Sequence, residues 1–145
     1  IGLNARLDTL QAAVLIEKLK ILDDEIKARN EIAARYSSAL AEYVPVPLVV
    51  EGNYSAWAQY TIRVPAQKRS AIMAALKEEG VPTMIYYPKP LHRQTAYRDF
   101  PVAGNGLPVS ERLADEVLSL PMHPYLDDET QDRIVSAFRH VLRAS

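Results

Sequence analysis

The sequence predicts an α+β fold, in which a long helix near the N-terminus is followed by a small unit of strands and further helices. Two observations carry this prediction. Apolar residues recur every three or four positions through most of 10–40, which is the spacing of an amphipathic helix. Residues 57–64 instead alternate between two faces, and 65–86 hold a helical pattern followed by a short β-branched run.

The N-terminal helix is expected to begin at Asp8. The run Asp8-Thr9-Leu10-Gln11 resembles a capping box, in which the Asp8 carboxylate accepts a hydrogen bond from the backbone N–H of Gln11. If the helix continued unbroken to Glu42, it would hold about 35 residues and span about 50 Å, which is longer than a domain of this size needs. Such a helix usually bridges two parts of a larger structure.

The middle of the chain is expected to form a strand at Trp57–Val64, a helix at Pro65–Glu79 that ends in a left-handed Gly80, and a short buried strand at Thr83–Tyr86. Pro88 ends the second strand because it lacks the N–H that a sheet ladder needs. The first strand is expected to place two sets of side chains on opposite faces, Ala58, Tyr60, Ile62 and Val64 on one and Trp57, Gln59, Thr61 and Arg63 on the other. The helix is expected to bury Ile72, Met73 and Leu76.

Further along, Arg93–Phe100 is expected to form a short helix and Pro101–Pro108 a glycine-containing connection. Ser110 can cap a helix that ends at Pro121, and Asp127 can cap the last helix. The first of these helices is expected to bury Leu113, Val117 and Leu118. The last is expected to bury Ile134, Val135, Phe138, Val141 and Leu142.

Composition and charge exclude several classes of function. The 17 basic and 18 acidic residues give a formal net charge of -1, whereas nucleic-acid binding needs a concentrated basic surface. No run approaches the ~20 apolar residues of a membrane-spanning helix. The absence of cysteine excludes disulfides and fits a cytoplasmic protein. The expected partners are small molecules or other proteins. Since the chain begins with Ile1 and no initiator methionine, we expect it to be a piece of a longer protein.

The strongest candidate for a site is the stretch Tyr86–Gln94, which gathers two phenols, an imidazole and a guanidinium around two prolines. Each proline fixes its own φ and pushes the preceding residue toward extended geometry. The side chains of Tyr86, Tyr87 and His92 are therefore presented at little entropic cost. The alternative is that these amphipathic side chains only cap the end of a strand.

Other chemistries lack the residues that they need. The three histidines are not paired at helical spacing and have no cysteine beside them, so no metal site is expected. The sequence has no Gly-x-Ser-x-Gly turn and no phosphate-binding glycine loop. Lys89 stands between two prolines in a polar loop, which favours a solvated amine over a Schiff-base nucleophile.

Motifs follow one another along the chain in a recognisable order. They are Gly2-Leu3-Asn4-Ala5-Arg6 leading into a helix with Gln11-Ala12-Ala13, then Tyr87–Gln94, Pro108–Arg112 and Ser119–Pro124. In this order they resemble the pyridoxal-phosphate-dependent sugar aminotransferases of the DegT/DnrJ/StrS family. The resemblance implies the C-terminal part of an aspartate-aminotransferase-like, fold type I enzyme. Residues 1–44 would be the loop and interface helix that leave the large cofactor domain. Residues 45–145 would be a small domain with a mainly antiparallel sheet.

The resemblance also implies the activity of the complete protein. Family members use pyridoxal 5'-phosphate to move an amino group, commonly from glutamate, onto a keto-sugar nucleotide. The family's lysine that binds the cofactor precedes the Gly-x-Asn-x-Arg loop, so this piece alone is expected to be inactive. The resemblance is greatest to enzymes that aminate a 3-keto, nucleotide-linked 2-acetamido uronic acid for bacterial surface polysaccharide such as O-antigen.

Matching motif positions imply roles for individual residues. In a homodimer joined through the long helix, Asn4 would contact the cofactor phosphate of the other subunit, and Arg6 would bind an anionic part of the substrate. Tyr86 and Tyr87 stand where close relatives place a His-Tyr pair near the sugar, and His92 would line the sugar pocket. The alternative for Asn4 and Arg6 is simple polarity at a helix entry. The alternative for the whole chain is a non-catalytic regulatory or dimerisation module.

Overall fold

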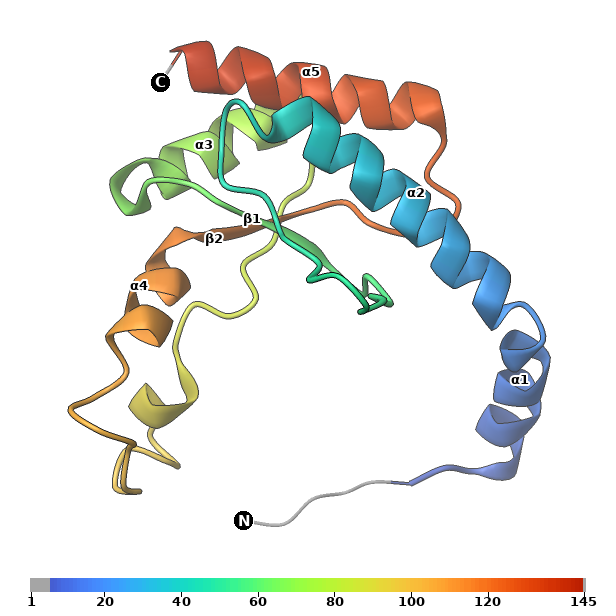
Figure 1. Cartoon of the computed structure of the whole chain (residues 1–145), viewed down its shortest axis with the longest axis horizontal. Coiled ribbons are helices and arrows are strands. Elements are labelled where there is room, and N and C mark those ends of the chain that lie inside the picture. The colour runs from blue at the N-terminus through green and yellow to red at the C-terminus, as the bar shows by residue number, and fades with distance from the viewer. Residues whose placement is uncertain (1–5, 145) are drawn as a thin grey trace.

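The computed structural model describes residues 6–144, and over these residues the predicted α+β class is confirmed (Figure 1). A small antiparallel sheet lies below a layer of helices. One arm of chain extends from the helical layer and another extends from the sheet on the opposite side. The elements in order are α1 (Thr9–Leu19), α2 (Leu22–Leu40), β1 (Tyr60–Arg63), α3 (Ala66–Glu78), the 3₁₀ helix η1 (Leu91–Arg93), α4 (Pro108–Glu116), β2 (Val117–Leu120) and α5 (Asp128–Ala144).

The sheet is formed by β1 and β2, which pair antiparallel with Tyr60 opposite Leu120. The alternation predicted for 57–64 is confirmed from Tyr60 onward, because Tyr60, Ile62 and Val64 are buried while Thr61 and Arg63 are only partly covered. The strand begins only at Tyr60, and Ala58 is exposed. A single bridge between Met84 and Ser119 adds a third segment. The short buried strand predicted at 83–86 is therefore wrong. Flanking prolines at 82 and 88 cannot donate to a ladder, and Met84 is 55% exposed.

The core lies between the sheet and helices α2, α3 and α5. Tyr36 of α2 packs on Tyr60 of β1 with ring centroids 4.9 Å apart, and Phe138 of α5 is fully buried. The Tyr36 hydroxyl donates to the carbonyl of Pro121 at 3.1 Å, so the buried phenol has a partner. The core residues predicted for α3 and α5 are confirmed as buried or partly buried. They are Ile72, Met73, Leu76, Ile134, Val135, Phe138, Val141 and Leu142.

Local signals at several element ends are confirmed. The Asp8 carboxylate caps α1 by accepting from Gln11 N–H at 2.8 Å, and the Asp127 carboxylate accepts from Thr130 N–H at 2.7 Å at the start of α5. Gly80 ends α3 with a φ of 73°, in the left-handed region.

The elements between η1 and β2 differ from the prediction. In place of a helix over 93–100 there is only η1 and a series of turns, because the extended backbone of Gln94 ends the helical conformation. Helix α4 begins at Pro108 and not at Ser110, with proline in the first turn, where its missing N–H costs nothing. The residues Val117 and Leu118 belong to β2 and not to a helix, because their backbone pairs with β1.

The long N-terminal helix is divided into two, so the prediction of one continuous helix is wrong. Between α1 and α2, the N–H groups of Lys20 and Ile21 bond to carbonyls three residues back, and Ile21 leaves helical geometry with a ψ of 4°. We call this break the elbow. Glu25 of α2 braces it, because its carboxylate accepts from the ammonium of Lys18 in α1 and from the hydroxyl of Tyr125.

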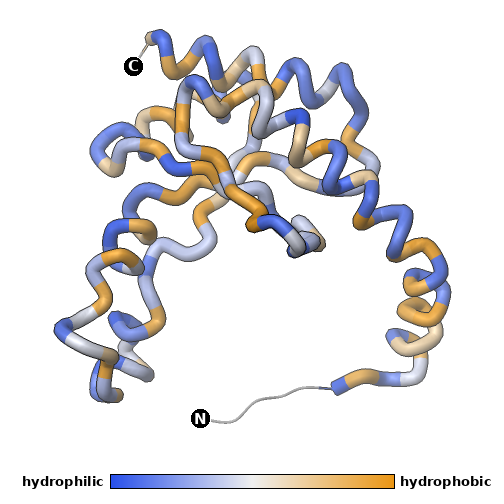
Figure 2. The backbone as a smooth tube through the Cα atoms, in the orientation of Figure 1, coloured by the Kyte–Doolittle hydropathy of each residue, from blue (hydrophilic) through white to orange (hydrophobic). Residues whose placement is uncertain are grey.

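Helix α1 contributes nothing to the core and has no buried residue. It extends away from the helical layer (Figure 1), and Figure 2 shows that it carries many apolar residues. The second half of α2, in contrast, is part of the core. The proposed domain division at residue 44 stays a prediction. No helix within residues 6–144 combines the length and apolar character needed to cross a membrane. In α1 and just before it, the large apolar residues with exposed side chains are Leu7, Leu10, Val14, Leu15, Ile16 and Leu19.

Candidate functional site

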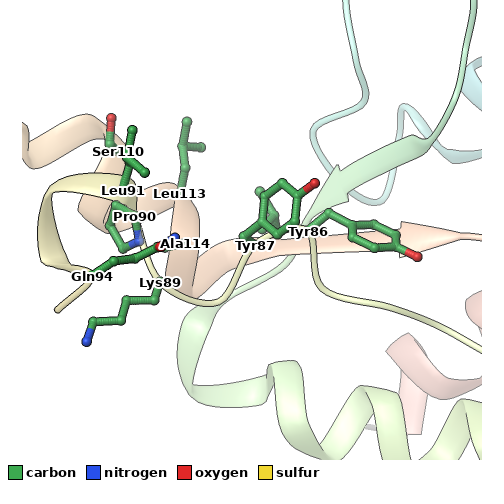
Figure 3. A pocket seen from close by; sticks show the side chains of 10 residues that line it. Tyr86, Tyr87, Lys89, Pro90, Leu91, Gln94, Ser110, Leu113 and Ala114 are labelled. Carbon is green, nitrogen blue, oxygen red and sulfur yellow. The ribbon is translucent and has the colours of Figure 1, made fainter. Parts of the chain in front are cut away.

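A cavity of about 530 Å³ lies between the proline-rich loop and α4 (Figure 3). One side carries Tyr86 and Tyr87, and the opposite side carries Leu91 of η1 and Ser110 of α4. The bridge at Met84 fixes the start of the loop to β2, and two prolines restrict the backbone that follows. A mostly apolar cavity with a few polar groups at its edge is the usual form of a small-molecule site.

The two tyrosines predicted as site residues are brought together at this cavity. Their ring centroids are 5.8 Å apart in an edge-to-face arrangement, and the peptide bond between them is cis. Tyr86 also lines a neighbouring cavity of about 310 Å³, beside Met84 and Ser119. Figure 3 shows the two hydroxyls pointing in different directions. With Tyr87 70% exposed and Tyr86 37% exposed, both phenols are accessible to a ligand.

His92 lies apart from the tyrosine cavity. It lines a separate apolar cavity of about 460 Å³, together with Tyr97 and Phe100. Its Nε2 is 2.9 Å from Oε1 of Glu111, a residue of α4, and the imidazole is only 14% exposed. The proposed contact between His92 and a sugar therefore stays a prediction, while its contact with Glu111 is a feature of the fold.

Glu111 is the residue that the sequence reasoning missed. Its Oε1 also accepts from Nε of Arg93 at 2.9 Å and lies 2.8 Å from a second guanidinium nitrogen. The hydrogen bond with His92, and then those with Arg93, hold the pKa of the Glu111 carboxyl below its usual range. A signal was present, because Glu111 stands within the motif Pro108–Arg112 and in the first turn of a helix, where an acidic side chain is favourable.

The remaining predicted residues are near the N-terminus. Asn4 lies outside the described residues. Arg6 is exposed and lines none of the cavities described above. Helix α1, which follows Arg6 closely in sequence, and helix α4, which borders the tyrosine cavity, lie on opposite sides of the molecule in Figure 1. An exposed guanidinium on an extended arm can reach toward another chain.

The described residues do not by themselves fit a cofactor that forms an imine with lysine. Such an amine needs a desolvated setting, but Lys89 is exposed. Figure 3 shows its side chain directed away from both tyrosines. Within residues 6–144, no group of three or more His, Cys, Asp or Glu side chains could hold a metal ion. The groups that the cavity does offer are suited to binding and orienting a ligand.

The sequence matches the DegT/DnrJ/EryC1/StrS aminotransferase family over residues 1–139, and the chain belongs to this family. It is 45% identical over 128 residues to the UDP-2-acetamido-2-deoxy-3-oxo-D-glucuronate aminotransferase of Pseudomonas aeruginosa. The matched region covers 88% of this chain and 34% of that protein. It is 41% identical over 148 residues to the pleiotropic regulatory protein of Geobacillus stearothermophilus, with 97% of this chain and 39% of that protein covered.

Solved structures agree with the fold. A DegT DnrJ EryC1 StrS aminotransferase from Brucella abortus superposes with a TM-score of 0.89 at 56% identity, covering 97% of this chain and 37% of that one. The NtdA structure from Bacillus subtilis, which holds the cofactor PMP, gives a TM-score of 0.82 at 35% identity, covering 98% of this chain and 34% of that one. The chain thus spans little more than a third of the length of these relatives. Two of them are aminotransferases by name, and the one from Pseudomonas aeruginosa is named for a nucleotide-linked sugar.

Proposed function

We propose that the complete protein is a pyridoxal-phosphate-dependent aminotransferase that transfers an amino group, from glutamate, to a keto-sugar nucleotide. The family match over residues 1–139 carries this proposal. The substrate proposed is a 3-keto, nucleotide-linked 2-acetamido uronic acid, because the relative from Pseudomonas aeruginosa acts on such a sugar. The product would serve bacterial surface polysaccharide, such as O-antigen, and the protein would act in the cytoplasm.

In this proposal, the chain supplies binding groups and the reactive lysine lies in the part of the protein that precedes it. Bound pyridoxal phosphate supplies the electron sink for amino transfer. Tyr86 and Tyr87 contact the sugar from the wall of the 530 Å³ cavity, since phenols can both pack on a sugar ring and hydrogen bond to its hydroxyls. Arg6 binds the uronate carboxylate, which its planar fork fits in a bidentate manner.

The proposed assembly is a homodimer, in which α1 of one subunit packs against the other. Exposed Leu10, Val14 and Leu19 support it, because an apolar helix surface of this extent is stabilised when a partner covers it. Asn4 and Arg6 would then reach the neighbouring subunit's site. The exposure of Arg6 is consistent with this arrangement.

The test is an assay of the full-length protein with glutamate and a panel of keto-sugar nucleotides that differ in charge and in the position of the ketone. We expect amination of UDP-2-acetamido-2-deoxy-3-oxo-D-glucuronate, detected by mass spectrometry of the product. A second candidate is a regulatory module, which the similarity to the pleiotropic regulatory protein favours. A full-length protein that retains no cofactor and aminates none of the panel would support that second candidate.

Replacing Asn4 by alanine in the full-length protein is expected to weaken cofactor affinity about tenfold to a hundredfold. This range corresponds to the ~1.5–3 kcal/mol of a hydrogen bond to a charged group such as a phosphate. Titration of the apo-protein with pyridoxal phosphate, followed by absorbance, measures it. Asn53→Ala, at an exposed turn, is the matched control and should leave affinity unchanged. Equal affinity in the Asn4→Ala variant and the wild type would contradict the phosphate role.

A further inference from the structure

The motif residues His92 and Glu111, which the proposed function does not use, meet in the fold. Oε1 of Glu111 is 2.9 Å from Nε2 of His92, 2.9 Å from Nε of Arg93 and 2.8 Å from a second nitrogen of that guanidinium. One carboxylate oxygen therefore joins η1 to the first turn of α4. We call this group, Glu111 with His92 and Arg93, the Glu111 clamp.

The segment that the clamp holds has little other support. Helix η1 has only three residues and no side-chain cap, and its ends at Pro90 and Gln94 have extended backbone. Beyond Gln94 the chain forms only turns, bends and irregular segments until α4 begins. Short helical turns of this kind have few hydrogen bonds of their own, so side-chain contacts decide where they lie.

The clamp lies at a wall shared by two cavities. Pro90, Leu91 and Ser110 line both the 530 Å³ cavity of the tyrosines and the 460 Å³ cavity of His92. Leu91 belongs to η1, Pro90 directly precedes it, and Ser110 belongs to α4, so these residues lie on the two elements that Glu111 joins or next to them. Movement of η1 away from α4 would open the wall and widen the tyrosine cavity on the side opposite Tyr87.

We propose that the Glu111 clamp positions this wall and thereby sets the affinity of the tyrosine cavity for the sugar nucleotide, with His92 acting through Glu111 and not by touching the sugar. The proposal rests on the proposed function and assigns His92 a positioning role. The geometry supports this role, because Nε2 already contacts the carboxylate and the imidazole is only 14% exposed. Residues that line a binding site must be held in place by their own contacts. A displacement of a positioning residue by about 1 Å can lower the reaction rate about a hundredfold.

The experiment compares His92→Phe, His92→Gln and Glu111→Gln in the full-length protein. Phenylalanine keeps the ring and removes the nitrogen, whereas the glutamine amide can restore a donor near the position of Nε2. His140→Phe on α5, where the imidazole is exposed, is the matched control. We expect His92→Phe and Glu111→Gln to raise KM for UDP-2-acetamido-2-deoxy-3-oxo-D-glucuronate about tenfold with a smaller change in kcat. His92→Gln is expected to recover most of the affinity, and the double variant His92→Phe/Glu111→Gln to add little.

Hydrogen exchange by mass spectrometry gives a readout that does not depend on activity. In both clamp-breaking variants, peptides over 89–100 should exchange faster while those of β1 and α5 stay unchanged. Three results would overturn the proposal. They are unchanged exchange over 89–100, an equal rise in exchange throughout the chain, and a KM that rises in His92→Phe but not in Glu111→Gln. A full-length protein that aminates no sugar would refute the proposed function, and the exchange comparison would then decide the clamp by itself.

Discussion

Replacing Arg6 by alanine in the full-length protein should lower kcat/KM for an acidic keto-sugar nucleotide about tenfold to a hundredfold more than for a neutral one. The reason is the charge of the substrate. A hydrogen bond between charged partners is worth ~1.5–3 kcal/mol, and every ~1.4 kcal/mol is a factor of ten. A neutral sugar cannot form the bidentate pair, so it loses less. Steady-state kinetics with one substrate of each kind measures the ratio.

Arg143→Ala is the control for this experiment, because it removes another exposed guanidinium at the distant end of α5. It should change neither substrate's kcat/KM. Equal losses on the acidic and the neutral sugar in Arg6→Ala would contradict recognition of a carboxylate. They would point instead to a general contribution of Arg6 to the site, such as a contact with a phosphate that both substrates share.

Replacing Phe138 by alanine should destabilise the fold by about 3–5 kcal/mol, the usual cost of truncating a fully buried aromatic side chain. Phe138 is 0% exposed, and α5 packs against both α2 and α3, so the resulting cavity would face two helices that cannot both close on it. Urea unfolding of the 145-residue chain can be followed by the fluorescence of Trp57, its single tryptophan, which packs 5.6 Å from the ring of Tyr60.

Phe100→Ala provides the matched control, because it is the same substitution at a residue that is 64% exposed. It should change the free energy of unfolding by less than about 0.5 kcal/mol. Should Phe138→Ala cost no more than Phe100→Ala, the core described here would be wrong.

Features that depend on neighbouring residues could be predicted from the sequence. The caps at Asp8 and Asp127 and the left-handed Gly80 each need only a few adjacent residues. The buried faces of β1 and α5 follow from periodicity, which the sequence displays directly. The tyrosine loop was also predicted as a site, and Tyr86 and Tyr87 do line a cavity.

Features that depend on distant partners could not be predicted in the same way. The run Val117–Leu120 reads equally well as the end of a helix, because a short apolar run has no distinct period, and only pairing with β1 makes it a strand. The partner of His92 lies 19 residues away on another element. The elbow contains neither glycine nor proline, but the acidic run Asp23-Asp24-Glu25 was a sign that a second helix begins there.

Because α1 contacts the rest of the structure mainly at the elbow, a small rotation there moves the far end of the helix by a larger distance. At about 1.5 Å per residue, its 11 residues form an arm of about 16 Å, so a rotation of about 10° at Ile21 displaces the far end by about 3 Å. Binding geometry tolerates only about 0.5 Å. Tyr125, whose hydroxyl donates to Glu25 a hundred positions earlier in the chain, therefore contributes with Lys18 to the orientation of α1. A substitution of Tyr125 in the loop after β2 would remove one of the two contacts that hold α1 against α2 at the elbow.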